Sequence, residues 1–297
     1  MSETMSRAKV AILGLGIMGS GMANRLLSVN FPLTVYNRSR EKCVPFANAG
    51  AFVAASPREA ASRSQIVLSM VGDDAASREI WLGENGGLQG ASSGSILIES
   101  STLSGDWIHE LASKGSERGC QFLDAPVTGT KPHAASGELV FLVGGSPEVL
   151  DAARPVLSVL GRGVLHFGPV GSGTLMKLIN NFVCGVQAAS FAEALTMIDA
   201  GKLDRDAAVS ILTGGAPGSG IVKRMADRMA TNDFAPNFAL HWMAKDLSYA
   251  LQNAADKGIR LQTAAAALAV FEQAIAEGHG DEDFSAVSKS SARRSNS

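Results

Sequence analysis

The chain has 297 residues, of which 46% are hydrophobic and 18% are charged, so it can bury one large core or two moderate ones. Because domains commonly contain about 100–200 residues, this length predicts two domains. The formal net charge of -2 provides no overall basic field, which argues against a protein dedicated to binding nucleic acid or an anionic membrane.

Cysteine and histidine, the residue types that most often bind metals or form disulfides, are scattered along the chain. The three cysteines, Cys43, Cys120 and Cys184, are far apart and form no CxxC pair, which favours a reducing compartment. The five histidines show no metal-ligand spacing; they are His109, His133, His166, His241 and His279. We therefore expect no metal.

No uninterrupted apolar run approaches the roughly 18 residues that a membrane span requires. Arg7 and Lys9 before the apolar run Val10–Met18 loosely resemble a signal peptide, but the glycines within that run argue against this interpretation. We expect a soluble, cytoplasmic protein.

Short apolar runs alternate with helical stretches from residue 9 to about 168, which predicts a parallel sheet covered by helices. The expected strands are Val10–Leu13, Leu33–Tyr36, Ile66–Met70, Ile96–Glu99, Gln121–Ala125, Val140–Val143 and Val164–Phe167. Met18–Ser28 has helical spacing, and Asp73 and Asp74 are expected to cap the helix that follows them.

Beyond Gly173 the strand signals stop, and Ala-, Leu- and Met-rich segments predict an all-helical second half. The fold class is therefore α/β, with an N-terminal Rossmann domain over residues 1–170 and a helical domain over 171–297. Thr174–Ala200 is apolar on nearly every side, which predicts a buried helix in which Glu193 is a structural hydrogen-bond partner. Ser285–Ser297 is expected to be a solvated tail.

A dinucleotide-binding turn is predicted where the first strand meets the first helix. The residues are Gly14, Leu15, Gly16, Ile17, Met18 and Gly19, which read GxGxxG. Gly14 permits a tight turn, Gly16 lets the backbone approach the pyrophosphate, and Gly19 lets the helix pack on the strand, while the helix N-terminus attracts the anion.

The end of the second strand indicates which cofactor binds. An NAD site usually has an acid about 20 residues after the turn, whereas an arginine accommodates a 2′-phosphate. This sequence has Asn37 and Arg38 at that point and no acid, so NADP is favoured over NAD. The alternative is that Arg38 and Arg40 belong to a solvated turn.

Lys177 and Asn181 lie four residues apart on one face of the apolar helix. A buried ammonium is costly without a partner. Either the lysine extends to solvent from a helix end, or the two residues line a cleft and transfer a proton.

With these residues the chain resembles the 3-hydroxyisobutyrate dehydrogenase, or β-hydroxyacid dehydrogenase, family over nearly its full length. Four segments match in order: GLGIMGSGMA at 14–23, DAPVTG at 124–129, GxGxxxKxxNN at 171–181, and Lys245-Asp246. The resemblance implies a catalytic Lys177 with Asn181 positioning the substrate.

The resemblance also implies further site residues. Thr128 and Gly129 would bind the substrate carboxylate, with threonine in place of the family's usual serine. The expected contacts to the nicotinamide side or ribose are Val71, Gly72, Ser101, Thr102 and Lys245, and Phe238 would close over the cofactor. Thr130, before Lys131-Pro132, partly resembles the glyoxylate and succinic semialdehyde reductase branch, but the segment lacks a second basic residue.

The implied reaction is reduction of a small carboxylate-bearing aldehyde or keto acid to a hydroxy acid, with protonated Lys177 as the proton donor. An ordinary lysine pKa of about 10.4 keeps such an acid loaded at neutral pH. Alternatives are an imine reductase, which usually has Asp or Tyr in place of the lysine, a 6-phosphogluconate dehydrogenase, and a catalytically silent NADP-binding scaffold. We expect a homodimer or homotetramer.

Overall fold

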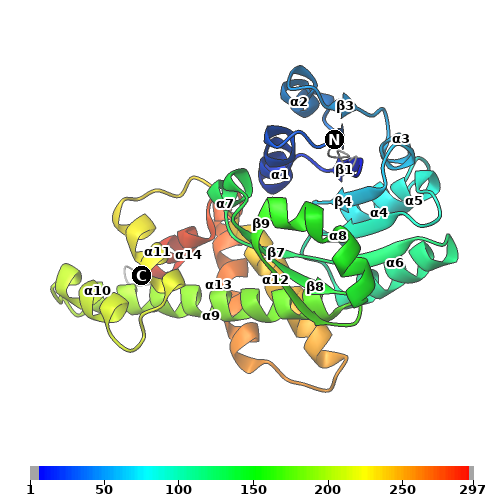
Figure 1. The fold of residues 1–297 in the computed structure, drawn as a ribbon. Coiled ribbons are helices and arrows are strands. Elements are labelled where there is room, and N and C mark those ends of the chain that lie inside the picture. Colours follow the sequence, from blue (N-terminus) through cyan, green and yellow to red (C-terminus); the bar gives the residue numbers. More distant parts are fainter. Residues whose placement is uncertain (1–6, 294–297) are drawn as a thin grey trace. The chain divides into compact units, whose positions relative to one another are not determined.

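The computed structural model describes residues 7–293, and the chain divides into two units, residues 1–177 and 178–297. The first unit contains a nine-stranded sheet in the order β3-β2-β1-β4-β5-β6-β8-β7, with β9 paired to β8 (Figure 1). Its strands are β1 Val10–Leu13, β2 Leu33–Tyr36, β3 Phe52–Val53, β4 Ile66–Ser69, β5 Ile96–Glu99, β6 Gln121–Asp124, β7 Val127–Thr128, β8 Leu139–Gly144 and β9 Gly161–Gly168.

All seven predicted strands are confirmed, and the predicted parallel sheet is confirmed for the strands from β3 to β6. The strands from β3 to β6 are parallel, whereas β8 is antiparallel to both β6 and β7. Only residues 129–138 connect β7 to β8, which is shorter than the dozen or more residues that a crossover to a parallel neighbour needs. The two-residue strands β3 and β7 were not predicted, because so few residues give no clear alternation.

Helices cover both faces of this sheet because its strands are apolar on both sides. Val10 and Ile12 of β1 pack with α1 and α8, while Ala11 and Leu13 pack in a second core with α4 and α6. The helices are α1 Ile17–Ser28, α2 Val44–Asn48, α3 Pro57–Ser62, α4 Asp74–Leu82, α5 Gly87–Gly90, α6 Gly105–Glu117, α7 Lys131–Ser136 and α8 Pro147–Leu160, with a 3₁₀ turn, η1, at Arg40–Cys43.

The second unit is helical, as predicted. The long helix α9, Ser172–Ala200, runs across the division between the units. It is followed by α10 Arg205–Gly214, α11 Gly220–Ala230, α12 Leu240–Ala255, α13 Gln262–Ala274, a π-helical turn η2 Ile275–His279, a 3₁₀ turn η3 Phe284–Ala286 and α14 Val287–Arg293. Their apolar faces form one core that includes Met225, Leu247 and Phe271. Among residues 7–293 no helix is long and apolar enough to span a membrane.

Two expectations about exposure in helix α9 are wrong. Helix α9 is not buried on every side, because Ile179, Val183 and Met197 are exposed. Glu193 is exposed as well, so it is not a buried hydrogen-bond partner. The helix has more apolar residues than the other helices of its own chain can cover.

The segment predicted as a solvated tail is folded from Ser285 onward. Ser285 is fully buried, and Ala286 and Val287 belong to the core of the second unit. The serine-rich composition concealed this packing, because Asp283 satisfies the buried Ser285 hydroxyl with a hydrogen bond of 2.8 Å. Residues 294–297 lie outside the described part of the chain.

Candidate active site

The nucleotide turn lies where the strand order of the sheet reverses. Strand β1 pairs with β2 on one side and β4 on the other, and ligands of open α/β sheets bind at such a position, beyond the carboxyl ends of the strands. Gly14 follows β1 with φ +100°, a conformation that favours glycine, and a β-carbon there would overlap the Met70 carbonyl after β4. The turn after β1 therefore packs directly on the end of β4.

The other two glycines have the predicted environments. A β-carbon at Gly19 would overlap the Gly14 carbonyl, so glycine is required where α1 packs on the turn. A β-carbon at Gly16 would meet no atom within 4 Å. Gly16 is also the N-cap of α1 and provides no side-chain acceptor, so the first N–H groups of this helix are available to an anion. These features fit a dinucleotide pyrophosphate.

The residues at the end of β2 differ in their contacts. Asn37 Oδ1 accepts a 2.8 Å hydrogen bond from Leu15 N, and its Nδ2 donates to the Ser39 carbonyl, so this side chain holds the nucleotide turn. Arg40 donates to the Ala54 carbonyl at 2.5 Å. The Arg38 side chain is exposed beside this frame, where it could meet a phosphate.

A buried carboxylate organises the predicted nicotinamide side. Glu99, at the end of β5, accepts hydrogen bonds from Ser69, Ser77, Trp81 and the backbone N–H of Ser101. The Ser101 hydroxyl in turn accepts from Val71 N at 2.8 Å. The loops after β4 and β5 are thereby tied together, and they bring Val71 and Gly72 beside Ser101 and Thr102.

The predicted substrate loop follows β7. Thr128 is half-buried, and Gly129 has φ +131°, so the chain reverses sharply towards α7. Thr130 caps that helix, where its backbone N–H and its hydroxyl both contact His133 Nδ1, at 3.1 and 2.8 Å. Sequence reasoning missed this histidine as a partner of the loop.

The proposed catalytic residues lie on α9. Lys177 is half-buried and lies one helical turn after Thr174, whose N–H bonds to Asp124 at the end of β6. Asn181, four residues further along α9, is buried; its Nδ2 donates to Asp246 Oδ2 at 2.5 Å, and its Oδ1 accepts from Asn180. Asp246 also lies 3.0 Å from Lys245 Nζ. Asp246 therefore links two predicted site residues.

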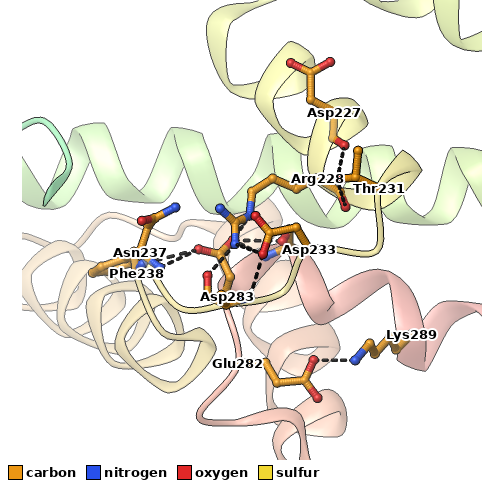
Figure 2. A network of polar contacts seen from close by, with 11 residues as sticks. Asp227, Arg228, Thr231, Asp233, Asn237, Phe238, Glu282, Asp283 and Lys289 are labelled. Atoms are coloured by element: carbon orange, nitrogen blue, oxygen red, sulfur yellow. Dashed lines mark hydrogen bonds and ion pairs between the residues drawn. The ribbon is translucent and has the colours of Figure 1, made fainter. Parts of the chain in front are cut away.

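Phe238 belongs to a polar network of the second unit. Asp283, buried in this unit, accepts from the backbone N–H groups of Asn237 and Phe238 and lies 3.3 Å from Arg228 Nε (Figure 2). The Phe238 ring packs edge-on against Phe284, with 6.0 Å between centroids. The loop that presents Phe238 is thus held from both its backbone and its side chain.

Several polar residues of this region were not assigned from the sequence. Asp124 and Asp246 stand inside the quoted motifs, which was the available signal, whereas Glu99 and Asp283 have no local signature. The prediction that Asp73 caps α4 is confirmed, but Asp74 instead accepts hydrogen bonds from Ser104. Within residues 7–293 no cluster of three or more His, Cys, Asp or Glu side chains could hold a metal ion.

Comparison with known proteins identifies the family. Residues 9–168 match the NAD binding domain of 6-phosphogluconate dehydrogenase, and residues 171–290 match the family described as NAD-binding of NADP-dependent 3-hydroxyisobutyrate dehydrogenase. The chain belongs to the 3-hydroxyisobutyrate dehydrogenase family. It is an NAD(P)-dependent oxidoreductase of the β-hydroxyacid dehydrogenase class.

Individual relatives of this dehydrogenase agree with the family assignment. It is 32% identical over 285 residues, 96% of the chain and 80% of the relative, to glyoxylate/succinic semialdehyde reductase 2 of Arabidopsis thaliana. The structure of 3-hydroxyisobutyrate dehydrogenase from Salmonella typhimurium has a TM-score of 0.86 at 29% identity, covering 95% of this chain and 99% of that one. An imine reductase from Pseudomonas sp., 20% identical with a TM-score of 0.61 over 96% and 99% of the two chains, shares the fold alone.

Proposed function

We propose that this dehydrogenase reduces a small carboxylate-bearing aldehyde or keto acid with NADPH, with Lys177 as the general acid. One observation carries the proposal. The parallel strands β1, β4, β5 and β6 end at one edge of the sheet, and their ends lead into the nucleotide turn, the loops of Val71 and Ser101, and Asp124. Asp124 holds the start of the helix that carries Lys177.

The reaction needs a hydride, a proton and a fixed substrate. When bound, the reduced nicotinamide supplies the hydride to the carbonyl carbon. The Lys177 ammonium donates a proton to the developing alkoxide oxygen, which stabilises the charge formed there. The Thr128 hydroxyl and the Gly129 N–H hold the substrate carboxylate, and Asn181 orients the carbonyl group.

The preference for NADP rests on Arg38. No carboxylate follows β2 to bind a ribose 2′-hydroxyl, and the exposed guanidinium of Arg38 can pair with a 2′-phosphate. Asn37, Gly14, Leu15, Gly16, Ile17, Met18 and Gly19 would form the backbone cradle, and Val71, Gly72, Ser101, Thr102, Phe238 and Lys245 the nicotinamide side.

The substrate class is inferred from the loop and from the relatives. Thr130-Lys131-Pro132 resembles the corresponding segment of glyoxylate and succinic semialdehyde reductases, and an Arabidopsis relative bears that name. The exposed Lys131 adds a positive charge next to the loop, which favours an anionic substrate. Glyoxylate and succinic semialdehyde are therefore the first candidates.

The proposed setting is a homodimer or homotetramer in the cytoplasm. Helix α10 has no fully buried residue; its Ile211 is 73% exposed, and Leu203, just before it in the chain, is 61% exposed. With Ile198 and Leu212 they line an apolar groove, the kind of surface that association covers. The thiols of Cys43 and Cys120 are free and buried, consistent with a reducing compartment.

Two alternative functions would require different residues of the chain. An imine reductase usually has Asp or Tyr in place of Lys177, so the lysine argues against it. A silent scaffold would bind NADPH but would not need Lys177, Asn181 and Thr128 together.

The test is oxidation of NADPH by the purified protein, followed by absorbance, with glyoxylate, succinic semialdehyde, methylmalonate semialdehyde, tartronate semialdehyde and a cyclic imine. We expect turnover of at least one carboxylate-bearing aldehyde. Turnover of the imine alone would favour the reductase rival, and NADPH binding without any turnover would favour the scaffold.

A further inference from the structure

Asp124 is a fully buried carboxylate at the carboxyl end of β6. Its Oδ1 accepts a 2.8 Å hydrogen bond from Gly171 N, and its Oδ2 accepts a 2.7 Å bond from Thr174 N. These two N–H groups lie on either side of Ser172 and Gly173, the first two residues of α9. The carboxylate therefore caps the helix that carries Lys177 from a residue 50 positions away in sequence.

Glycines bring the helix and the carboxylate together. A β-carbon at Gly144, the last residue of β8, would overlap Asp124 Oδ1, and a β-carbon at Gly173 would lie 2.8 Å from the Asp124 carbonyl. Gly171 has φ +91°, a conformation that favours glycine at the entry to the helix. The tight packing around these glycines restricts where the Asp124 carboxylate can lie.

Asp124 is connected to both parts of the proposed site, to one through the chain and to the other through its hydrogen bond to Thr174. In one direction, three residues separate it from Thr128, in the substrate loop. In the other, Thr174 precedes Lys177 by three residues, a rise of about 4.5 Å along an α-helix. Asp124 thus joins the start of the helix that carries Lys177 to the strand that leads into the proposed carboxylate-binding loop.

This position is unfavourable for a charge. Burial raises the pKa of Asp124 above its ordinary value, and the hydrogen bonds from Gly171 and Thr174 act in the opposite direction. A raised pKa means that the ionised carboxylate lowers the stability of the folded state at neutral pH. The carboxylate is therefore poorly explained by stability alone.

We propose that Asp124 is a positioning residue for the reaction: it sets the location of the Lys177 helix relative to the substrate loop and places a negative charge at the first turn of that helix. This inference rests on the proposed function of Lys177. The positioning itself concerns the start of α9 and can be measured without activity.

The test is Asp124→Asn, which keeps the size of the side chain but removes the charge and one of the two acceptors. The Asn variant cannot satisfy both N–H groups, so we expect kcat for aldehyde reduction to fall about tenfold to hundredfold, as displacements near 1 Å do. NADPH affinity, measured by fluorescence, should stay the same, because the nucleotide turn lies on β1.

The pH profile separates positioning from a general structural defect. Removing the negative charge bonded to Thr174, one helical turn before Lys177, favours the neutral amine of Lys177, so the high-pH limb of reduction should move to lower pH. Other titratable groups around Asp124 remain in the variant: Glu99 pairs with it across β5 and β6, His109 of α6 packs against Gly171, and His166 on β9 bonds to the Gly145 carbonyl. A shift of the high-pH limb would therefore result from the loss of the Asp124 charge.

Amide hydrogen exchange tests the cap directly. In the variant we expect faster exchange over residues 171–175, with the strands of the sheet unchanged. The matched control is Asp204→Asn, which alters an exposed carboxylate that caps α10 through Ala207 N. Since asparagine is an equally good N-cap, it should change neither kcat nor the pH limb.

Each outcome decides the inference. Unchanged exchange at 171–175, or a kcat loss without movement of the pH limb, would overturn it. Lys177→Ala is measured in parallel: if that variant keeps full activity, the proposed function fails, whereas the exchange result still decides whether Asp124 anchors the helix.

Discussion

Arg38 and Arg40 are two residues apart and both are exposed, but they differ in their contacts. Arg40 bonds to the Ala54 carbonyl, and Arg38 is exposed. We predict that Arg38→Ala weakens NADPH binding about tenfold or more, the effect of losing a charge-assisted hydrogen bond, and leaves NADH binding nearly unchanged. Titration of both cofactors by fluorescence measures this.

Arg40→Ala is the control for this prediction. Arg40 holds the turn after β2 through its bond to the Ala54 carbonyl, so this variant should weaken the binding of NADPH and of NADH alike. Equal losses for NADPH and NADH in Arg38→Ala would contradict a role in binding the 2′-phosphate.

At the same scale, Lys177 is the proposed general acid. We expect Lys177→Ala to lower kcat by about 10²–10⁴-fold, because general acid catalysis contributes that much. Lys177→Arg should also be slow, since a guanidinium holds its proton too tightly to donate it. Steady-state kinetics on a variant with unchanged NADPH affinity gives the answer, and a normal kcat in Lys177→Ala would remove this residue from the mechanism.

At the scale of elements, α1 differs from several other helices of the sheet unit. Ser56, Asp73, Ser104 and Ser146 cap α3, α4, α6 and α8 with side-chain oxygens, whereas α1 begins at Gly16 without such a cap. An uncapped N-terminus beside open space is a site where an anion adds both hydrogen bonds and charge complementarity.

Gly16→Ala tests this element. The added methyl meets no protein atom within 4 Å, and Gly16 has an ordinary φ of −71°, so the apo protein should keep its melting temperature. We expect NADPH affinity to fall at least about tenfold, because the methyl occupies the approach of the pyrophosphate.

Gly220→Ala is the matched control, since Gly220 also has open space around it at the start of α11. It should change neither stability nor binding by much. Tight NADPH binding by Gly16→Ala would place the pyrophosphate elsewhere.

At the scale of the whole molecule, the exposed apolar surface of the helical unit predicts association. Met197 and Ile211 are 76% and 73% exposed, and exposed apolar surface of this kind is typical of a protein–protein interface. Light scattering should give a multiple of the 30.8 kDa chain mass. Ile211→Glu should shift the distribution towards 30.8 kDa at low concentration.

Ile259→Glu, at another exposed apolar residue of this unit, is the control and should remain associated. A wild-type mass that stays at 30.8 kDa across concentrations would contradict the predicted oligomer.

The sequence by itself determined the class of this protein. The seven main strands, the helical second half and the GxGxxG turn follow from local periodicity and from glycines with steric reasons, and the family follows from four ordered motifs. These features are local, so neighbouring residues are enough to reveal them.

Only the tertiary structure decided which polar residues act together. Asp124 meets Gly171 and Thr174, Glu99 meets Ser101 and Trp81, and Asp283 meets Phe238, and these partners are separated by between 2 and 50 residues in the chain. No sequence pattern predicts such pairs, because a buried carboxylate selects whatever N–H groups the packed sheet and helices bring to it. Composition predicted a solvated Ser285 and a buried helix around Met197, whereas the packing buries Ser285 and leaves Met197 exposed.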